Sequence, residues 1–296
     1  MREHPDFRAW VALFAVYFFW GTTYLAIRMA LESFPPLVMI SLRFLLSGVV
    51  LVIAAVLLRA HLPRGRELWM TAFYGVMALG GGNGTLVFAE QWIPSGLAAL
   101  FITTGPFWMV GVEHLLPGGK RLHIPMLAGI AVGFTGVLML VAPAAFGSGF
   151  QASLLKGFLV LQLGSVCWTT GSLLQRRHPA RAHPIVSGAI QQVATGLAFV
   201  APAALIDERA VEWNPRGVAA LVYLVVFGSI VGYSAYVYAL NKLPVAVVST
   251  YTYVNPVVAV FLGWVFYREP FGMREAVAMM MIFAGVALVK YWTKPV

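Results

Sequence analysis

Aromatic and hydroxyl side chains recur within long apolar stretches of this sequence, at spacings that put them on one face of a helix. In the first stretch, Trp20, Thr23 and Tyr24 stand at positions i, i+3 and i+4, and Trp168 and Thr169 share a face in a later stretch. Side chains at such spacings lie one above another on a helix. Aromatic walls with a few hydrogen-bonding groups bind small molecules, so these residues are candidates for a binding site.

Three other residues join this candidate site: Asn83, in the glycine-rich run at 80–84, and the tyrosines Tyr233 and Tyr251. We predict that all of these side chains line one central cavity. Hydroxyl and amide groups also hydrogen-bond between packed helices, which is the structural alternative for each of them. For the two tryptophans the alternative is an interfacial aromatic belt, although both stand deep in their stretches. The glycine-rich run lies inside an apolar stretch, so it indicates close packing rather than a phosphate-binding loop.

Two prolines, Pro106 and Pro256, each fall about a dozen residues into an apolar stretch. Proline removes a backbone hydrogen bond and kinks a helix, and the freed carbonyl can face a cavity. A static packing kink is the alternative. Because the two prolines occupy matching places in a sequence repeat described below, we predict that they form paired gating bends.

Few ionisable groups lie inside the apolar stretches, and each is a candidate for function. Arg43 either reaches outward to the membrane surface or faces the cavity and meets a carboxylate. Arg28 and Glu32 are four residues apart at the end of a stretch and are predicted to pair. Glu90 stands near the end of its stretch, where we expect it to be solvated or interfacial.

The composition is that of an integral membrane protein. Of the 296 residues, 60% are hydrophobic and 10% are charged, and the mean hydropathy is +0.83, whereas soluble domains carry about 25% charged residues. The net charge of +9 comes from basic residues scattered singly, which argues against a nucleic acid partner. The single cysteine, Cys167, excludes a disulfide within the chain and offers no metal-site spacing. We expect no catalytic residues, no metal and no cofactor.

Ten apolar stretches are long enough to cross a bilayer, since about 20 mostly apolar residues are needed. They run over 9–30, 37–58, 68–91, 95–116, 123–143, 154–175, 185–206, 217–240, 244–266 and 274–292. Pro94 and Pro244 separate adjacent stretches at tight turns. Lys and Arg favour the loops that would be cytoplasmic if the N-terminus were inside, so both termini are predicted to be cytoplasmic.

The second half of the sequence repeats the first. Residues 88–140 match 238–288 in order, with Pro94 against Pro244 at an offset of about 150 residues. The repeat predicts two units of five helices, at 1–145 and 150–296. Because five is odd, the second unit must be inverted in the membrane, as in many secondary transporters. Small residues on one helix face are expected to pack within the bundle rather than to form a dimer: Gly129, Gly133 and Gly136.

Several short motifs punctuate this repeat: Trp-Gly-Thr-Thr-Tyr at 20–24, Pro-Ser-Gly-Leu-Ala-Ala-Leu at 94–100, Asn-Pro at 255–256 and Arg-Glu-Pro at 268–270. With the five-helix duplication, the whole chain resembles the EamA family of the drug/metabolite transporter superfamily, and its aromatic amino acid exporters most of all. The resemblance implies ten helices around a central cavity, lined by the first, third, fourth, sixth, eighth and ninth helices. It also implies a location in the cell inner membrane.

We therefore predict an inner-membrane carrier that exports small metabolites, amino acids above all, by alternating access. We expect it to act as a monomer in the lipid bilayer. Multidrug transporters of the superfamily with four helices use an acid in the first helix for proton exchange. This chain has none in the middle of that helix, so the coupling ion stays open. Cationic drugs, sugars or nucleotide sugars are alternative substrates, and an intramembrane enzyme or lipid-handling protein is the alternative from another class.

Overall fold

The computed structural model describes residues 7–118, 124–146, 152–178, 180–206, 210–243, 245–248 and 250–292. Every regular element within these ranges is helical. The elements are α1 (Phe7–Ala30), α2 (Pro36–Leu57), α3 (Arg66–Gly75), η1 (Val76–Asn83), α4 (Gly84–Ala89), α5 (Ser95–Ile102), α6 (Gly105–Leu115), α7 (Ile124–Phe146), α8 (Ala152–Arg177), α9 (Pro184–Ile206), α10 (Pro215–Tyr223), η2 (Leu224–Val231), α11 (Gly232–Lys242), α12 (Val245–Val248), α13 (Tyr251–Tyr267) and α14 (Met273–Trp292).

Proline marks several of the helix starts. Pro36, Pro184 and Pro215 are the first residues of α2, α9 and α10, where the missing N–H leaves no bond unmade. The side chain of Asn214 also caps α10, accepting a hydrogen bond of 2.7 Å from the Gly217 N–H. Pro94 has extended backbone between α4 and α5, which confirms the predicted break there. The matching Pro244 lies outside the described residues.

The described helices include six that are long and apolar enough to cross a membrane. They cover Phe7–Ala30, Pro36–Leu57, Ser95–Leu115, Ala152–Arg177, Pro184–Ile206 and Pro215–Tyr236, and shorter apolar helices cover Ile124–Leu140 and Tyr251–Tyr267. The predicted all-α membrane architecture is therefore confirmed in its class. Ten spans, the inversion of the second unit and the units 1–145 and 150–296 stay predictions.

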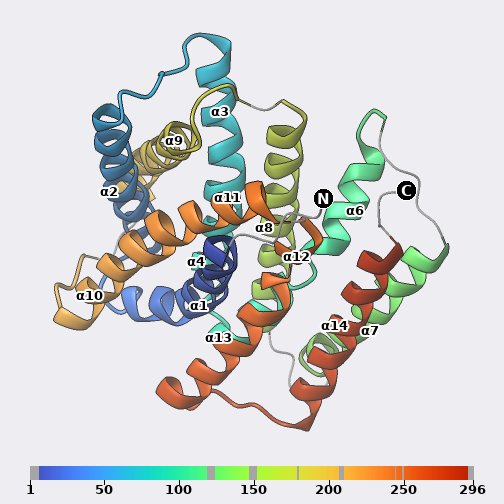
Figure 1. The fold of residues 1–296 in the computed structure, drawn as a ribbon. Coiled ribbons are helices and arrows are strands. Elements are labelled where there is room, and N and C mark those ends of the chain that lie inside the picture. Colours follow the sequence, from blue (N-terminus) through green and yellow to red (C-terminus); the bar gives the residue numbers. More distant parts are fainter. Residues whose placement is uncertain are drawn as a thin grey trace.

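Two pairs of helices make the most extensive contacts, α2 with α9 and α7 with α14, and Figure 1 shows them at opposite edges of the molecule. Glycine allows the second pair to approach. A methyl group on Gly285 would lie 2.5 Å from the backbone nitrogen of Gly133, and one on Gly136 would lie 2.7 Å from the carbonyl oxygen of Ala278. The predicted packing role of the glycines on α7 is confirmed.

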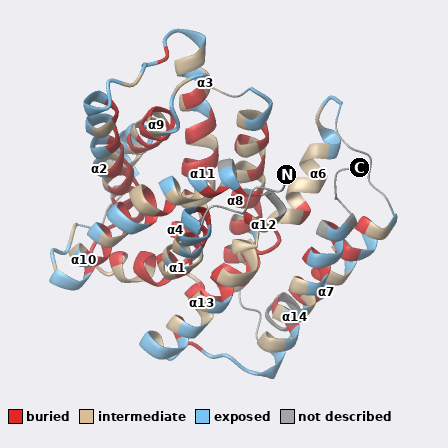
Figure 2. Ribbon diagram, viewed as in Figure 1, coloured by how far each residue is buried: buried red, intermediate tan, exposed pale blue. Residues whose placement is uncertain are grey.

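Large apolar side chains cover much of the outer surface. On α2 the exposed face carries Leu46, Val49, Val50, Ile53 and Val56, and Figure 2 shows buried and exposed residues on opposite sides of this helix. A soluble monomer rarely exposes so continuous an apolar surface. Contact with lipid chains explains this apolar surface, because lipid chains form no hydrogen bonds with the protein.

Two π-helical segments occupy matching places in the chain. η1 follows α3 and η2 follows α10, and both have eight residues. η1 packs on α8 and α9, whereas η2 packs on α1 and α2. Each segment therefore contacts the first two helices of the other half. Short π-helical turns are rare and often stand at functional sites.

Candidate functional site

The two predicted tryptophans meet in the middle of the helix bundle. The ring centres of Trp20 on α1 and Trp168 on α8 are 6.4 Å apart, with an interplanar angle of 88°. Tyr251 on α13 stands edge-on to Trp20 at 5.2 Å, and Tyr236 on α11 lies 5.0 Å from it. These four rings form the aromatic cluster. It joins helices from both halves of the chain. Trp20 meets Trp168 and Tyr251 edge-to-face, a geometry that aromatic rings favour, and lies tilted at 35° to Tyr236.

Glycine makes room for both tryptophans. A methyl group on Gly82, in η1, would lie 3.0 Å from the Trp168 ring. One on Gly232, which follows η2, would lie 2.6 Å from Nε1 of Trp20. Each tryptophan therefore packs on the π-helical region of the other half, and a larger residue at Gly232 would displace the indole.

The π-helical geometry of η2 also orients Trp20. In an α-helix the Gly232 N–H would bond to the Gly228 carbonyl, four residues earlier. Here it bonds to the Phe227 carbonyl, five residues earlier. The Gly228 oxygen is left to accept a hydrogen bond of 3.2 Å from Nε1 of Trp20. The irregular helix thus supplies an acceptor that holds the indole in place.

Tyr233 is turned away from the aromatic cluster. Its hydroxyl donates a 2.8 Å hydrogen bond to Oε1 of Gln191 on α9, and its ring lies against Gly188. Tyr236, which was not among the predicted residues, occupies the place beside Trp20. The face of this helix was predicted with α-helical spacing, whereas the π-helical turn in η2 rotates the residues that follow it. Tyr233 and Tyr236 are only three residues apart in α11, so their spacing in the sequence did not distinguish the two.

The remaining predicted residues lie on the helices that carry the two tryptophans, α1 and α8, and on η1. The Thr23 hydroxyl donates to the Trp20 carbonyl at 2.6 Å, so it is satisfied within its own helix. Tyr24 and Thr169 are buried. Asn83 is half-buried at the end of η1. The structure therefore brings Trp168 and Tyr251 into contact with Trp20 and places Thr23 one turn along the same helix. Solute binding by these residues stays a prediction.

The two prolines differ from each other in their helices. Pro256 lies inside α13, as predicted. Pro106 lies in the first turn of α6, after an interruption of regular helix at 103–104, within the apolar span Ser95–Leu115. Proline fits a first turn because the N–H it lacks would have no partner in the helix. A gating role for either proline stays a prediction.

A cluster of charged residues closes one end of the bundle. Arg28 forms an ion pair with Glu269, not with Glu32 as predicted. Glu32 lies 3.5 Å from Arg216 and also accepts a hydrogen bond from the Tyr267 hydroxyl. The guanidinium of Arg28 stands over the Tyr267 ring, 4.2 Å from its centre. Glu269, although distant in the sequence, replaces Glu32 as the partner of Arg28 because the end of α13 lies against the end of α1.

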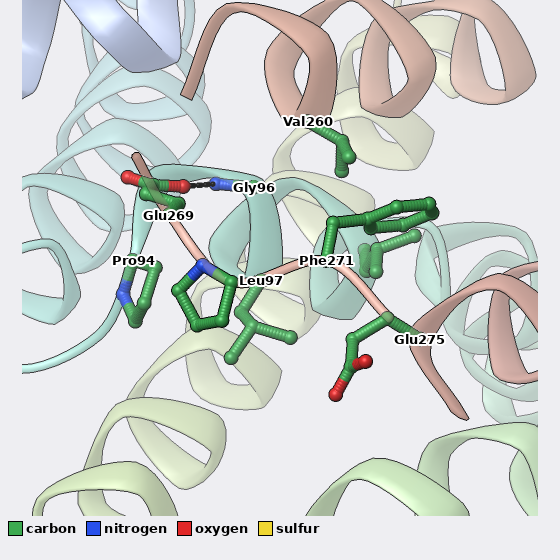
Figure 3. Close-up of a pocket in the computed structure, with 9 residues that line it drawn as sticks. Pro94, Gly96, Leu97, Val260, Glu269, Phe271 and Glu275 are labelled. Atoms are coloured by element: carbon green, nitrogen blue, oxygen red, sulfur yellow. Dashed lines mark hydrogen bonds between the residues drawn. The ribbon is translucent and has the colours of Figure 1, made fainter. Parts of the chain in front are cut away.

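Glu269 also holds the start of α5. Its carboxylate accepts hydrogen bonds from Ser95 N (2.9 Å), Ser95 Oγ (2.8 Å) and Gly96 N (2.9 Å), and Figure 3 shows the bond to Gly96. A carboxylate is stabilised at a helix N-terminus, where N–H groups lack partners. The adjacent cavity, lined by Pro94, Leu97 and Phe271 among others, measures about 10 Å³. That volume suits one water molecule, so a metabolite does not pass here in this conformation.

Two further charged residues are buried deeper, Arg43 on α2 and Glu90 at the end of α4. They are 5% and 6% exposed. The prediction of a solvated Glu90 is wrong, because this side chain is buried at the end of α4, which packs on α8, η1 and α2. Arg43 Nε donates to Ser229 Oγ at 2.9 Å. Across the described part of the chain, no group of three or more His, Cys, Asp or Glu side chains could hold a metal ion.

Comparison with known proteins identifies relatives over almost the whole chain. The sequence matches the EamA-like transporter family twice, at residues 8–142 and 155–291. It is 36% identical to the uncharacterized inner membrane transporter YedA of Escherichia coli K12, over 94% of this chain and 89% of the relative. It is 25% identical to the uncharacterized transporter YvbV of Bacillus subtilis strain 168, over 99% and 95%. One crystal structure, 24% identical, shares the fold with a TM-score of 0.68 over 96% of both chains.

Proposed function

This chain belongs to the EamA-like transporter family, and we propose that it exports amino acids across a cell inner membrane by alternating access. It acts as a transporter rather than as an enzyme, in keeping with the names of its relatives. We further propose that it works as a monomer with both termini in the cytoplasm and that its halves, 1–145 and 150–296, are inverted repeats. Transport by this mechanism requires no resident cofactor or metal.

The aromatic cluster is the observation that carries this proposal. Trp20, Trp168, Tyr236 and Tyr251 come from α1, α8, α11 and α13, are half-buried, and converge on one another. Aromatic faces and edges attract apolar and aromatic side chains. A site of this kind favours phenylalanine, tryptophan or leucine over small polar solutes. Because ring contacts are individually weak, affinity is low, which suits a carrier that exports a surplus.

Alternating access needs a closed and an open state at each end of the site. In the proposed orientation, the end of α1 that carries Arg28 faces outward. The Arg28–Glu269 pair and the narrow cavity beside α5 close that end. Release of solute to the outside would separate α13 from α5, with Pro256 as the bend that allows α13 to move. The Pro106 region would bend in the matching step at the opposite end.

Uptake into proteoliposomes tests the function directly. Purified protein is reconstituted in sealed vesicles, and the flux of radiolabelled phenylalanine, leucine, threonine and lysine is compared with that of a cationic dye and a nucleotide sugar. Flux of phenylalanine above that of protein-free vesicles, saturable and inhibited by unlabelled tryptophan, supports the proposal. A preference for the dye or the nucleotide sugar would replace amino acids as the substrate class. Chemical conversion of the solute without transfer would indicate an enzyme.

A further inference from the structure

Arg43 and Glu90 are both buried and still have hydrogen-bonding capacity. Among the described residues, Nη1 of Arg43 has no hydrogen-bond partner, and neither has Oε1 or Oε2 of Glu90. Both side chains are more than nine-tenths buried. The two opposite charges act on each other electrostatically, yet no ion pair joins them in the part of the chain that the structure describes.

Gly228 connects Arg43 to the aromatic cluster. The Gly228 carbonyl accepts the hydrogen bond from Trp20 Nε1. A methyl group on Gly228 would lie 3.1 Å from Nη2 of Arg43 and 3.0 Å from Cγ2 of Thr23. The guanidinium and the indole therefore flank one residue of η2. A ligand whose charged group met Arg43 would have its apolar part within reach of Trp20.

A polar network holds Arg43 from one side only. Its Nε donates to Ser229 Oγ, the Gln192 side chain donates to the Ser229 carbonyl at 3.3 Å, and Ser47 donates to Gln192. These bonds tie α2, α9 and η2 together and fix the plane of the guanidinium. They do not use Nη1. The arrangement fixes an arginine while leaving an N–H group for another acceptor, whereas a purely structural arginine would be expected to use all its donors.

Glu90 presents the complementary charge. It follows α4, and the charges of Glu269, Arg28 and Arg43 all act on its carboxyl group. Glu269 is already engaged with Arg28 and the start of α5, so it does not neutralise Arg43. A buried carboxylate without hydrogen bonds is strongly destabilising. Both groups are thus held at a cost to stability that a bound ligand would offset.

We propose that Arg43 binds the carboxylate, and Glu90 the ammonium group, of a zwitterionic amino acid whose side chain contacts the aromatic cluster. The inference rests on the proposed function and deepens it. An anion alone would leave Glu90 unpaired, and a cation alone would leave Arg43 unpaired. A zwitterion satisfies both, and the bidentate geometry of guanidinium with carboxylate supplies directionality. The aromatic cluster then selects the side chain, while the charged pair selects the headgroup.

Three solutes that differ only in the headgroup test the inference: phenylalanine, 2-phenylethylamine and 3-phenylpropionate. Fluxes of each are measured in proteoliposomes of wild-type protein, Arg43→Gln and Glu90→Gln. The readout is the ratio of fluxes within one preparation, which does not depend on how much protein is folded. Arg274→Gln and Glu275→Gln are matched controls, because these residues form a separate ion pair with each other at 2.9 Å.

The wild-type protein is expected to prefer phenylalanine to both analogues. In Arg43→Gln, the preference for phenylalanine over 2-phenylethylamine should fall by about tenfold or more. In Glu90→Gln, the preference for phenylalanine over 3-phenylpropionate should fall by a similar factor. A hydrogen bond to a charged group contributes about 1.5–3 kcal/mol, which corresponds to roughly tenfold to a hundredfold. The two control variants should keep the wild-type ratios. The ratio of amine flux to acid flux should therefore rise in Arg43→Gln and fall in Glu90→Gln, and these opposite shifts support the inference.

Several results would overturn the inference. Unchanged ratios, or shifts in the same direction in both test variants, would assign the residues to structure. A pH-gradient dependence that Glu90→Gln removes, with solute ratios unchanged, would assign Glu90 to proton exchange instead. If the wild-type protein carries phenylalanine, these results leave the proposed function standing. If it does not carry phenylalanine and phenylalanine does not raise its Tm in detergent, both the function and the headgroup site are wrong.

Discussion

The two π-helical segments, η1 and η2, have the same backbone geometry but differ in the side chains that they contact. η1 has glycine at 80, 81 and 82. Gly81 and Gly82 admit Cys167 and Trp168 of α8, and Gly80 lies against Phe199 of α9. η2 admits Trp20, but Ser229 and the Gly228 carbonyl also give it polar contacts to Arg43 and Trp20. One segment is a close-packing surface, and the other is a close-packing surface with hydrogen-bonding groups.

The same asymmetry extends to the charges. Pro36 matches Pro184 at the starts of α2 and α9, so the residue that corresponds to Arg43 is Gln191. Pro94 matches Pro244, so the residue that corresponds to Glu90 is Leu240. The tryptophans and helix-starting prolines are present in both halves, whereas Arg43 and Glu90 have uncharged counterparts in the second half. Duplication thus explains the scaffold, and its divergence explains where a ligand of defined charge would bind.

Truncation of the tryptophans should have the largest effect. Trp20 contacts three other rings and donates a hydrogen bond, whereas Trp168 contacts Trp20 across the repeat. Trp→Ala in a core costs about 3–5 kcal/mol, and we expect Trp20→Ala to lie nearer the upper end than Trp168→Ala. In both variants, phenylalanine flux per folded molecule should fall relative to threonine flux.

Flux in proteoliposomes, normalised to folded protein, measures this prediction, and the Tm in detergent reports the stability. Trp69→Ala is the control, because that indole is 74% exposed. Unchanged flux and unchanged ranking of the two amino acids in both test variants would leave the aromatic cluster with a packing role alone.

The second-largest effect is expected when a methyl group is added to each π-helical region, because the two regions should tolerate it differently. In Gly232→Ala the new Cβ would lie 2.6 Å from Trp20 Nε1 and 2.8 Å from the Phe227 carbonyl, whereas in Gly82→Ala the nearest ring atom is 3.0 Å away. Overpacking costs about 1–3 kcal/mol. The backbone carbonyl near Gly232 can move aside less easily than the Trp168 ring near Gly82. We expect Gly232→Ala to lower the free energy of unfolding more than Gly82→Ala does.

Equilibrium unfolding in detergent compares the two glycine variants. Gly105→Ala serves as the control, since no atom lies within 4 Å of its added Cβ. Equal losses of unfolding free energy in Gly232→Ala and Gly82→Ala would show that η1 and η2 tolerate an added methyl group equally well and do not differ in packing.

Much of the fold was predictable because its signals are local. Apolar stretches and prolines located the helices, and the pairing of Trp20 with Trp168 followed from the repeat. The ion pair between Arg28 and Glu269, 241 residues apart, carries no local signal, and a nearer carboxylate at Glu32 was the obvious partner. The place of Tyr236 depends on a π-helical turn that periodic spacing does not predict.

Loss of the ion pair at the outer end should have a moderate effect. Arg28→Gln removes the charge that faces Glu269, and because Arg28 is 31% exposed we expect the free energy of unfolding to fall by only about 1–2 kcal/mol. Opening at this end should become more frequent, so maleimide labelling of Leu97→Cys in a Cys167→Ser background should speed up several-fold. Arg274→Gln is the control. Unchanged labelling would show that this ion pair does not keep the end closed.

The smallest effect tests the polar feature that distinguishes η2. Ser229→Ala removes the acceptor of the Arg43 Nε hydrogen bond, and Ser229 is buried. Loss of one such bond should lower the free energy of unfolding by about 1 kcal/mol. Because the guanidinium is then less firmly oriented, the flux ratio of phenylalanine to 2-phenylethylamine should fall severalfold, less than in Arg43→Gln. Ser234→Ala, at an exposed position on α11, should change neither quantity. A stability loss with an unchanged flux ratio would mean that Ser229 joins helices without positioning Arg43, and η2 would then differ from η1 in packing alone.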